Sequence, residues 1–178
     1  ILAHSNESEW AVFRGEKRNE AFIDRVTLIK APYCLRLYEE VQILQKLIRN
    51  SELSSAPCAP DTLKSLAKLV LLTRYVNPEE GIGSTYRAKL RVYDGEIIKD
   101  VDPKAKPIDQ YLNHAGVNEG MAGLSTRDEF KMLAKTFNAE GDEVSANPVD
   151  LFYIIEQEVR QMQKGKEEET WLGKFLKE

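Results

Sequence analysis

Apolar residues in the first half of the chain recur at helical spacing, and this regularity constrains the fold more than any other feature of the sequence. Between residues 35 and 48 they occur three or four positions apart, at Leu37, Val41, Leu44, Leu47 and Ile48. This spacing places an apolar stripe on one side of an α-helix, and such a stripe has to be buried against another element. A helix near residues 36–49 is therefore expected to belong to a helical bundle.

Three further segments predict helices of the same bundle, near residues 62–76, 127–137 and 149–161. Each is preceded by residues that suit a helix N-cap: Asp61 or Thr62, Ser125 and Asn147. Ser125 is followed three residues later by Asp128, which approximates a capping box. The sequence thus favours a mainly α fold. Residues 78–120, rich in Gly and Pro, are expected to form an insertion of short elements.

The N-terminal segment has a different pattern, which predicts two strands separated by a short helix. Residues 1–4 are a short apolar run that ends in polar residues, and residues 26–29 are rich in β-branched side chains. Pro32 ends the second run. Strands of this kind normally lie in a parallel sheet that is covered on both faces. This part of the chain is therefore expected to be α/β.

Composition excludes several functional classes. The 25 basic and 29 acidic residues give a net charge of −4, so no global positive field attracts nucleic acid or anionic lipid. The longest apolar run, residues 69–72, is far shorter than a membrane span. Cys34 and Cys58 have neither disulfide-framework nor zinc spacing. We expect a cytoplasmic protein with no metal site of its own, no nucleic-acid partner and no membrane partner.

Three polar residues are candidates for phosphate chemistry. Asn6 follows the first expected strand, where a neutral amide can orient a water beside a phosphate. Arg25 precedes the second, and an arginine at a subunit edge can stabilise charge on a transferred phosphoryl group. Arg127 lies in the first turn of a capped helix, a rigid position from which a guanidinium can bind phosphate. Each has a structural alternative: a helix cap for Asn6, an ion pair with Asp24 or another carboxylate for Arg25, and a solvated face for Arg127.

The order of these features resembles the second half of an AAA+ ATPase. Asn6 ends a strand, EAFIDRV spans residues 20–26, and GLSTR spans residues 123–127. Further runs resemble the PrkA family of bacterial serine protein kinases: HSNESEW (4–10), APCAP (56–60), RVYDGE (91–96), DPKAK (102–106) and GVNEGM (116–121). The resemblance extends from residue 1 to about residue 161.

The resemblance implies a role for each candidate. Asn6 matches sensor 1, which places the attacking water, and Arg25 matches the arginine finger, which reaches the nucleotide of a neighbouring subunit. Arg127 matches sensor 2, which reports nucleotide state to the helical lid. The implied architecture is the C-terminal end of the nucleotide-binding core (1–34), a helical lid with the insertion (35–163) and the start of a C-terminal region (164–178).

ATP and Mg²⁺ are the cofactors that the resemblance implies, but the Gly-rich phosphate-binding loop is absent from this sequence. The chain also begins without Met, so we expect a piece of a longer protein that is inactive alone. The first hypothesis is part of an ATP-dependent serine protein kinase, with protein substrates and homo-oligomeric assembly through AAA+ interfaces. The alternative is an AAA+ remodelling or scaffold protein, in which nucleotide drives the rearrangement of partners.

Overall fold

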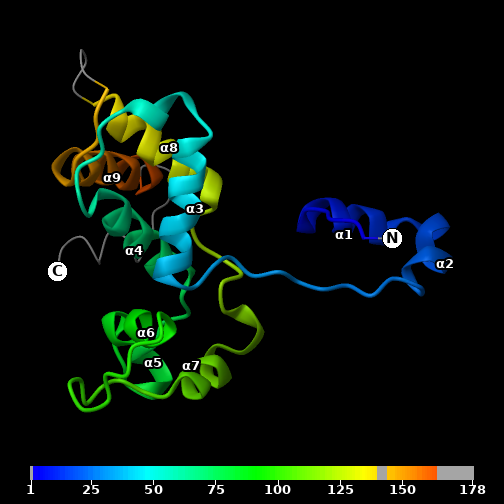
Figure 1. The fold of residues 1–178 in the computed structure, drawn as a ribbon. Helices are drawn as coiled ribbons and strands as arrows, with labels where there is room; N and C mark the ends of the chain where they lie inside the picture. Colours follow the sequence, from blue (N-terminus) through cyan, green and yellow to red (C-terminus); the bar gives the residue numbers. More distant parts are fainter. Residues whose placement is uncertain (1, 140–143, 164–178) are drawn as a thin grey trace. The chain divides into compact units, whose positions relative to one another are not determined.

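The computed structural model describes residues 2–139 and 144–163, which divide into two compact units (Figure 1). Unit 1 comprises Ile1–Ala31 and unit 2 comprises Pro32–Glu178. The expected C-terminal region at 164–178 lies outside the described residues. The boundary expected at residue 34 stays a prediction.

Unit 1 contains two short α-helices and an intervening 3₁₀ turn: α1 (Glu7–Gly15), η1 (Lys17–Asn19) and α2 (Glu20–Ile23). Its helices are linked by aromatic contacts, because the Phe13 ring stacks on Trp10 with centroids 5.8 Å apart and meets Phe22 edge-on at 5.6 Å. None of its described residues is buried. Side-chain burial therefore contributes little to the stability of this unit.

The prediction of two strands in the N-terminal part is wrong for the residues that the structure describes. Residues 2–5 and 26–36 have no regular secondary structure, and residues 2–139 and 144–163 contain no strand apart from an isolated parallel bridge between Cys58 and Ala146. A strand needs a neighbour to accept and donate its backbone hydrogen bonds. The β-branched run at 26–29 finds no such neighbour among the described residues.

Unit 2 is helical, which confirms the mainly α class. Its elements are α3 (Leu37–Arg49), η2 (Glu52–Ser55), α4 (Thr62–Arg74), α5 (Glu79–Ile82), α6 (Tyr86–Tyr93), α7 (Ile108–Ala115), η3 (Gly116–Asn118), α8 (Thr126–Phe137) and α9 (Pro148–Gln163). The four predicted bundle helices correspond to α3, α4, α8 and α9. None of the helices described is both long and apolar enough to cross a bilayer.

The core of unit 2 is centred on α4. This helix contacts α3 on one side and α8 and α9 on another, and α8 also packs on α9 (Figure 1). Fully buried leucines come from all four helices: Leu44, Leu66, Leu71, Leu133 and Leu151. At its C-terminal end α4 also contacts α6, and α6 in turn contacts α7. The end of α4 therefore meets both the bundle and the short elements of residues 78–120.

Candidate functional site

Asn6 occupies the N-cap position of α1, and its side chain is exposed. Its backbone carbonyl accepts a hydrogen bond from the N–H of Trp10 at 2.9 Å. The side-chain amide makes no capping hydrogen bond. Asn6 therefore occupies the cap position that the structural alternative expects, but it makes no side-chain cap, and the amide is open to solvent.

Arg25 lies just after the C-terminal end of α2, where its backbone N–H donates to the carbonyl of Phe22 at 3.0 Å. Its side chain is exposed. Among residues 2–139 and 144–163 it forms no ion pair with Asp24 or any other carboxylate. The guanidinium therefore remains uncompensated within the described chain, contrary to the ion-pair alternative.

The segments around Asn6 and Arg25 belong to one unit and are joined by an ion pair. Glu7, next to Asn6, accepts from the Lys30 ammonium at 2.8 Å. Lys30 lowers the pKa of Glu7, first through this hydrogen bond and then through its charge. Both side chains are well exposed, so solvent screening makes the pair a weak link. Arg127 belongs to unit 2.

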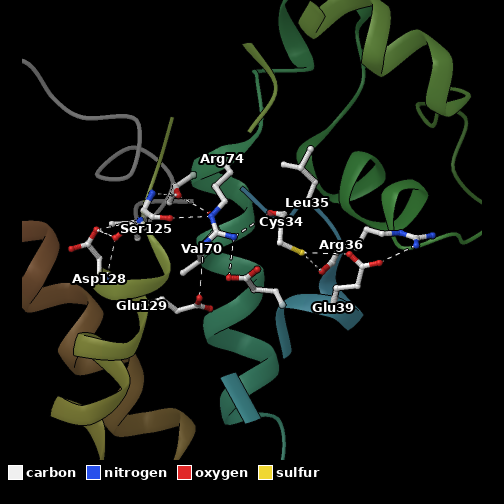
Figure 2. Close-up of polar contacts among 12 residues, drawn as sticks. Cys34, Leu35, Arg36, Glu39, Val70, Arg74, Ser125, Asp128 and Glu129 are labelled. Atoms are coloured by element: carbon white, nitrogen blue, oxygen red, sulfur yellow. Dashed lines mark hydrogen bonds and ion pairs between the residues drawn. The ribbon is translucent and has the colours of Figure 1, made fainter. Parts of the chain in front are cut away.

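Arg127 lies in the first turn of α8, and the capping box predicted for this helix is confirmed (Figure 2). The Ser125 hydroxyl accepts from the N–H of Asp128 at 3.2 Å, while the Asp128 carboxylate accepts from the N–H of Ser125, also at 3.2 Å. These two reciprocal hydrogen bonds fix Ser125 and Asp128, the residues that flank the first turn, and so hold the backbone on either side of Arg127. The Arg127 side chain itself is exposed.

The position of Arg127 is electrostatically unfavourable for stability. A helix N-terminus carries about half a positive charge, which repels a cation in the first turn. In the region that the structure describes, no carboxylate forms an ion pair with Arg127. Helix stability therefore does not explain a guanidinium here. The arrangement suits an anion, which would meet a guanidinium together with free backbone N–H groups.

The loop that leads into α8 is held by the C-terminal end of α4. The Arg74 Nε donates to the carbonyl of Leu124 at 3.0 Å, and the N–H of Leu124 donates to the Thr73 hydroxyl at 2.8 Å. Gly123 has φ +99°, and a Cβ there would lie 2.5 Å from the Thr73 carbonyl oxygen. Both main-chain groups of Leu124 are thus bonded to consecutive residues of α4, and only glycine fits before it.

The other side of the Arg74 guanidinium holds residues 33–35, which we call the strap because they connect unit 1 to α3. Nη1 of Arg74 donates to the carbonyl of Cys34 at 3.1 Å (Figure 2). The Tyr75 hydroxyl donates to the carbonyl of Leu35 at 2.7 Å. The Tyr33 N–H donates to the carbonyl of Gly120 at 2.9 Å. Every residue of the strap is therefore hydrogen-bonded through its backbone.

Two buried carboxyl groups, those of Glu40 and Glu129, accompany Arg74. Nη1 of Arg74 lies 2.9 Å from Glu40 Oε1, whereas Nη2 lies 3.8 Å from Glu129 Oε2, and all three side chains are fully buried. Burial raises the pKa of Glu129 to about 9, and the neighbouring Glu40 carboxylate adds to the shift, while Arg74 opposes it. Glu129 is therefore the protonated member at neutral pH.

Glu40 is the charged member of the pair. Burial by itself raises its pKa, but the interactions with Glu129 and Arg74 outweigh burial and hold the pKa below its usual range. The cluster Arg74–Glu40–Glu129 then carries one positive and one negative charge. This balance is what a site without access to water requires.

A second buried ion pair connects the short elements of residues 78–120. Lys89 donates to Glu119 at 2.8 Å and to the carbonyl of Val76 at 2.9 Å. Its ammonium lies 5.2, 5.5 and 5.9 Å from the ring centroids of Tyr75, Tyr93 and Tyr111. Burial lowers the pKa of Lys89, and the pairing with Glu119 opposes that shift. Two of the three ammonium donors are hydrogen-bonded within the fold and three tyrosine rings surround the charge, so we assign this lysine a structural role.

The Arg74 cluster was not predicted from the sequence, although the sequence contains a signal for it. Glu40 lies three residues after Leu37 and four before Leu44, and Arg74 lies four residues after Val70. Charged residues at these positions of an apolar stripe face the core, where an isolated charge is costly. That placement indicates a buried polar cluster, but it does not identify the partners.

A hollow of about 370 Å³ lies on unit 1 around Val12 and Phe13, and none of the three candidate residues lines it. Within the described ranges, no three His, Cys, Asp or Glu side chains could hold a metal ion together. The roles of Asn6, Arg25 and Arg127 stay predictions.

Two family models match the chain. The description "PrkA AAA domain" covers residues 1–81, and "PrkA serine protein kinase C-terminal domain" covers residues 88–178. Asn6 and Arg25 lie in the first match and Arg127 lies in the second. In the structure the two matched regions share one core, since α3 and α4 come from the first and α8 and α9 from the second.

Curated relatives give the same family. The chain is 53% identical over 99% of its length to "Serine/threonine kinase YeaG" of Escherichia coli K12 and covers 27% of that protein. It is 31% identical over 88% of its length to "ATP-dependent protease PrkA" of Bacillus subtilis, of which it covers 24%. The chain thus spans about a quarter of the length of these relatives. No solved structure matches it.

Proposed function

Since the chain belongs to the PrkA family of serine protein kinases, we propose that it is the nucleotide-sensing part of an ATP-dependent serine protein kinase. The observation that carries the proposal is that Arg25 and Arg127 both present exposed guanidinium groups that no described carboxylate neutralises. Such groups are suited to phosphate oxygens. We place the kinase in the cytoplasm. Both cysteines of the chain are free thiols, the state that a reducing compartment favours.

The three candidates fit the phosphates of ATP but not a magnesium ion. Arg25 and Arg127 offer only donors, and Asn6 offers a single amide oxygen together with an NH₂ group. Mg²⁺ takes octahedral oxygen ligands, mostly carboxylates, phosphates and water. We therefore propose that Mg²⁺ and the phosphate-binding loop come from regions of the full-length protein that this sequence does not contain.

Each candidate has one role in the proposal. The amide of Asn6 orients the attacking water without adding negative charge beside the phosphate. Arg25 reaches the nucleotide of a neighbouring subunit in a homo-oligomer and stabilises the charge that develops during phosphoryl transfer. Arg127 binds the nucleotide from the rigid first turn of α8. ATP supplies the phosphoryl group, and the proposed acceptors are serine residues of protein substrates.

Arg25→Ala in the full-length protein provides the test. We expect ATP turnover to fall by about 1,000-fold, the low end of what an arginine finger contributes, while the Kd for ATP changes less than about threefold, because the finger belongs to the neighbouring subunit. Radiolabelled ATP hydrolysis and nucleotide titration measure the two quantities. Arg14→Ala is the matched control, since Arg14 is also exposed and in unit 1.

An equal loss of turnover and of ATP binding in Arg25→Ala would assign Arg25 a structural role and overturn the proposal for that residue. The 178-residue chain alone is a second control. Without the phosphate-binding loop it is expected to show no ATP turnover and no phosphotransfer. Measurable hydrolysis by this chain would contradict the assignment of the phosphate site to other regions.

The alternative is an AAA+ remodelling or scaffold protein, and the Bacillus subtilis relative is named a protease. One assay separates the three activities. Full-length protein is incubated with labelled ATP and a protein substrate, with and without the region after residue 178. Label on serine supports the kinase, peptide fragments support the protease, and ATP-dependent partner rearrangement without either supports the scaffold.

A further inference from the structure

The end of α4 contacts two segments that are 90 residues apart in sequence. Thr73 and Arg74 bond both main-chain groups of Leu124 at 2.8 and 3.0 Å, and Arg74 bonds the carbonyl of Cys34 at 3.1 Å. Leu124 is directly followed by Ser125, the N-cap of the helix that presents Arg127. Cys34 lies in the strap. One side chain therefore spans the distance between the entry to the Arg127 helix and the segment that continues from unit 1.

The guanidinium is well suited to transmit a displacement between these segments. It is planar, its donors have a fixed geometry, and its contacts with Leu124 and Cys34 use different nitrogen atoms. The Arg74 side chain is fully buried, as are its acidic neighbours Glu40 and Glu129. The Tyr33 ring adds a cation–π contact, with Arg74 Cζ 4.9 Å from its centroid. Rotation of Arg74 away from one carbonyl would break several of these contacts at once.

Close backbone contacts also restrict how the loop before α8 sits on the end of α4. Gly123 approaches Thr73 so closely that a side chain would not fit, and the N–H of Gly120 donates to the carbonyl of Arg74 at 3.1 Å. The loop before α8 therefore cannot shift relative to α4 without breaking hydrogen bonds at Leu124 and Gly120. Because α8 begins at Thr126, the same restriction applies to the backbone of Arg127.

We propose that Thr73 and Arg74 are positioning residues that hold Arg127 in register with the strap, so that the Arg127 guanidinium is placed to bind nucleotide. The inference rests on the proposed function, because it takes Arg127 as the nucleotide contact. Thr73 and Arg74 touch neither nucleotide nor substrate in this scheme. They act on the reaction only through the placement of Leu124 and Cys34.

The test is a double-mutant cycle in the full-length protein, with the KM for ATP and kcat measured for each variant. Thr73→Val removes the hydroxyl that accepts from Leu124, and we expect the KM for ATP to rise about fivefold, the range that loss of one hydrogen bond gives. Thr73→Ser keeps the hydroxyl and is expected to match the wild type. Arg74→Lys is the second probe, because an ammonium cannot hold both carbonyls in a fixed geometry.

The decisive comparison is with Arg127→Ala. If Thr73 acts through Arg127, the double variant Thr73→Val/Arg127→Ala has the same KM as Arg127→Ala alone. If the fold-increases in KM of the two single variants multiply in the double variant, the inference is overturned. It is also overturned if Arg127→Ala raises the KM for ATP but Thr73→Val and Arg74→Lys both leave it unchanged. Unchanged KM in Arg127→Ala overturns the sensor role and the inference together. Thermal unfolding of each variant shows whether it is folded, and a variant that does not fold is replaced in the cycle by the other probe.

Discussion

Glu129 shows at the scale of a single residue how the buried cluster is neutralised. It holds a proton at neutral pH, so Gln at this position has the same charge and nearly the same shape. We expect Glu129→Gln to change the free energy of unfolding of the 178-residue chain by less than about 1 kcal/mol at pH 4, where the carboxyl is mostly protonated in both the folded and the unfolded chain. Glu40→Gln removes the charged partner of Arg74 and is expected to cost about 3 to 5 kcal/mol. Urea denaturation measures both.

The same residue predicts how stability depends on pH. The Glu129 carboxyl ionises near pH 4.5 when unfolded but keeps its proton to about pH 9 when folded. Its contribution is therefore complete below pH 4.5 and is lost as the pH rises towards 9. The difference in unfolding free energy between wild type and Glu129→Gln should fall across this window by at most about 1.4 kcal/mol per pH unit. A constant difference from pH 5 to 9 would contradict a protonated Glu129.

Residue-scale predictions from sequence succeeded where the interaction is local. The capping box of Ser125 and Asp128 spans three residues, and its hydrogen bonds are those expected. The partners of Arg74 are 34, 50 and 55 residues away, at Glu40, Leu124 and Glu129. No periodicity in the sequence determines such pairings, because they depend on how the helices pack. The roles of Asn6, Arg25 and Arg127 stay predictions.

At the scale of the element, α3 receives its cap from a distant part of the chain. The Asp94 carboxylate, just past the end of α6, accepts from the N–H of Tyr38 in the first turn of α3 at 2.9 Å. Arg36 at the N-cap position makes no side-chain cap. We expect Asp94→Ala to cost about 1 kcal/mol of stability, as loss of an N-cap does, and to speed hydrogen exchange at the Tyr38 amide.

Asp94→Asn is the matched control, because its amide oxygen can still accept from Tyr38 while the negative charge at the helix N-terminus is lost. It should lose less than half as much stability as Asp94→Ala. Equal losses would mean that charge, not the hydrogen bond, stabilises α3. The cap explains why α3 begins at Leu37, a boundary that apolar spacing alone placed only approximately.

Helices were easier to predict than strands for a related reason. Each bundle helix satisfies its backbone hydrogen bonds internally, so an apolar stripe and a cap suffice to indicate it. A strand depends on a neighbour elsewhere in the chain. The run at residues 26–29 has the composition of a strand, but within the described chain no other segment pairs with it.

At the scale of the whole molecule, the buried core belongs to unit 2 and crosses the boundary between the two family matches. We expect the fragment Pro32–Glu178 to unfold cooperatively, because it contains α3, α4, α8 and α9. The fragment of residues 1–87 lacks α8 and α9 and leaves the apolar face of α4 uncovered. It should lack a cooperative transition by near-UV circular dichroism. Cooperative unfolding of 1–87 would show that the AAA match is an independent structural unit.

The way in which Arg74 reaches its neighbours has a consequence for sequence evolution. Its bonds to residues 34 and 124 end on backbone carbonyls, which every amino acid possesses. Substitutions at these two positions leave the bonds intact, whereas position 74 requires a guanidinium. Substitutions at positions 34 and 124 are therefore independent of the residue at position 74. We therefore expect position 74 not to covary with positions 34 and 124 among related sequences.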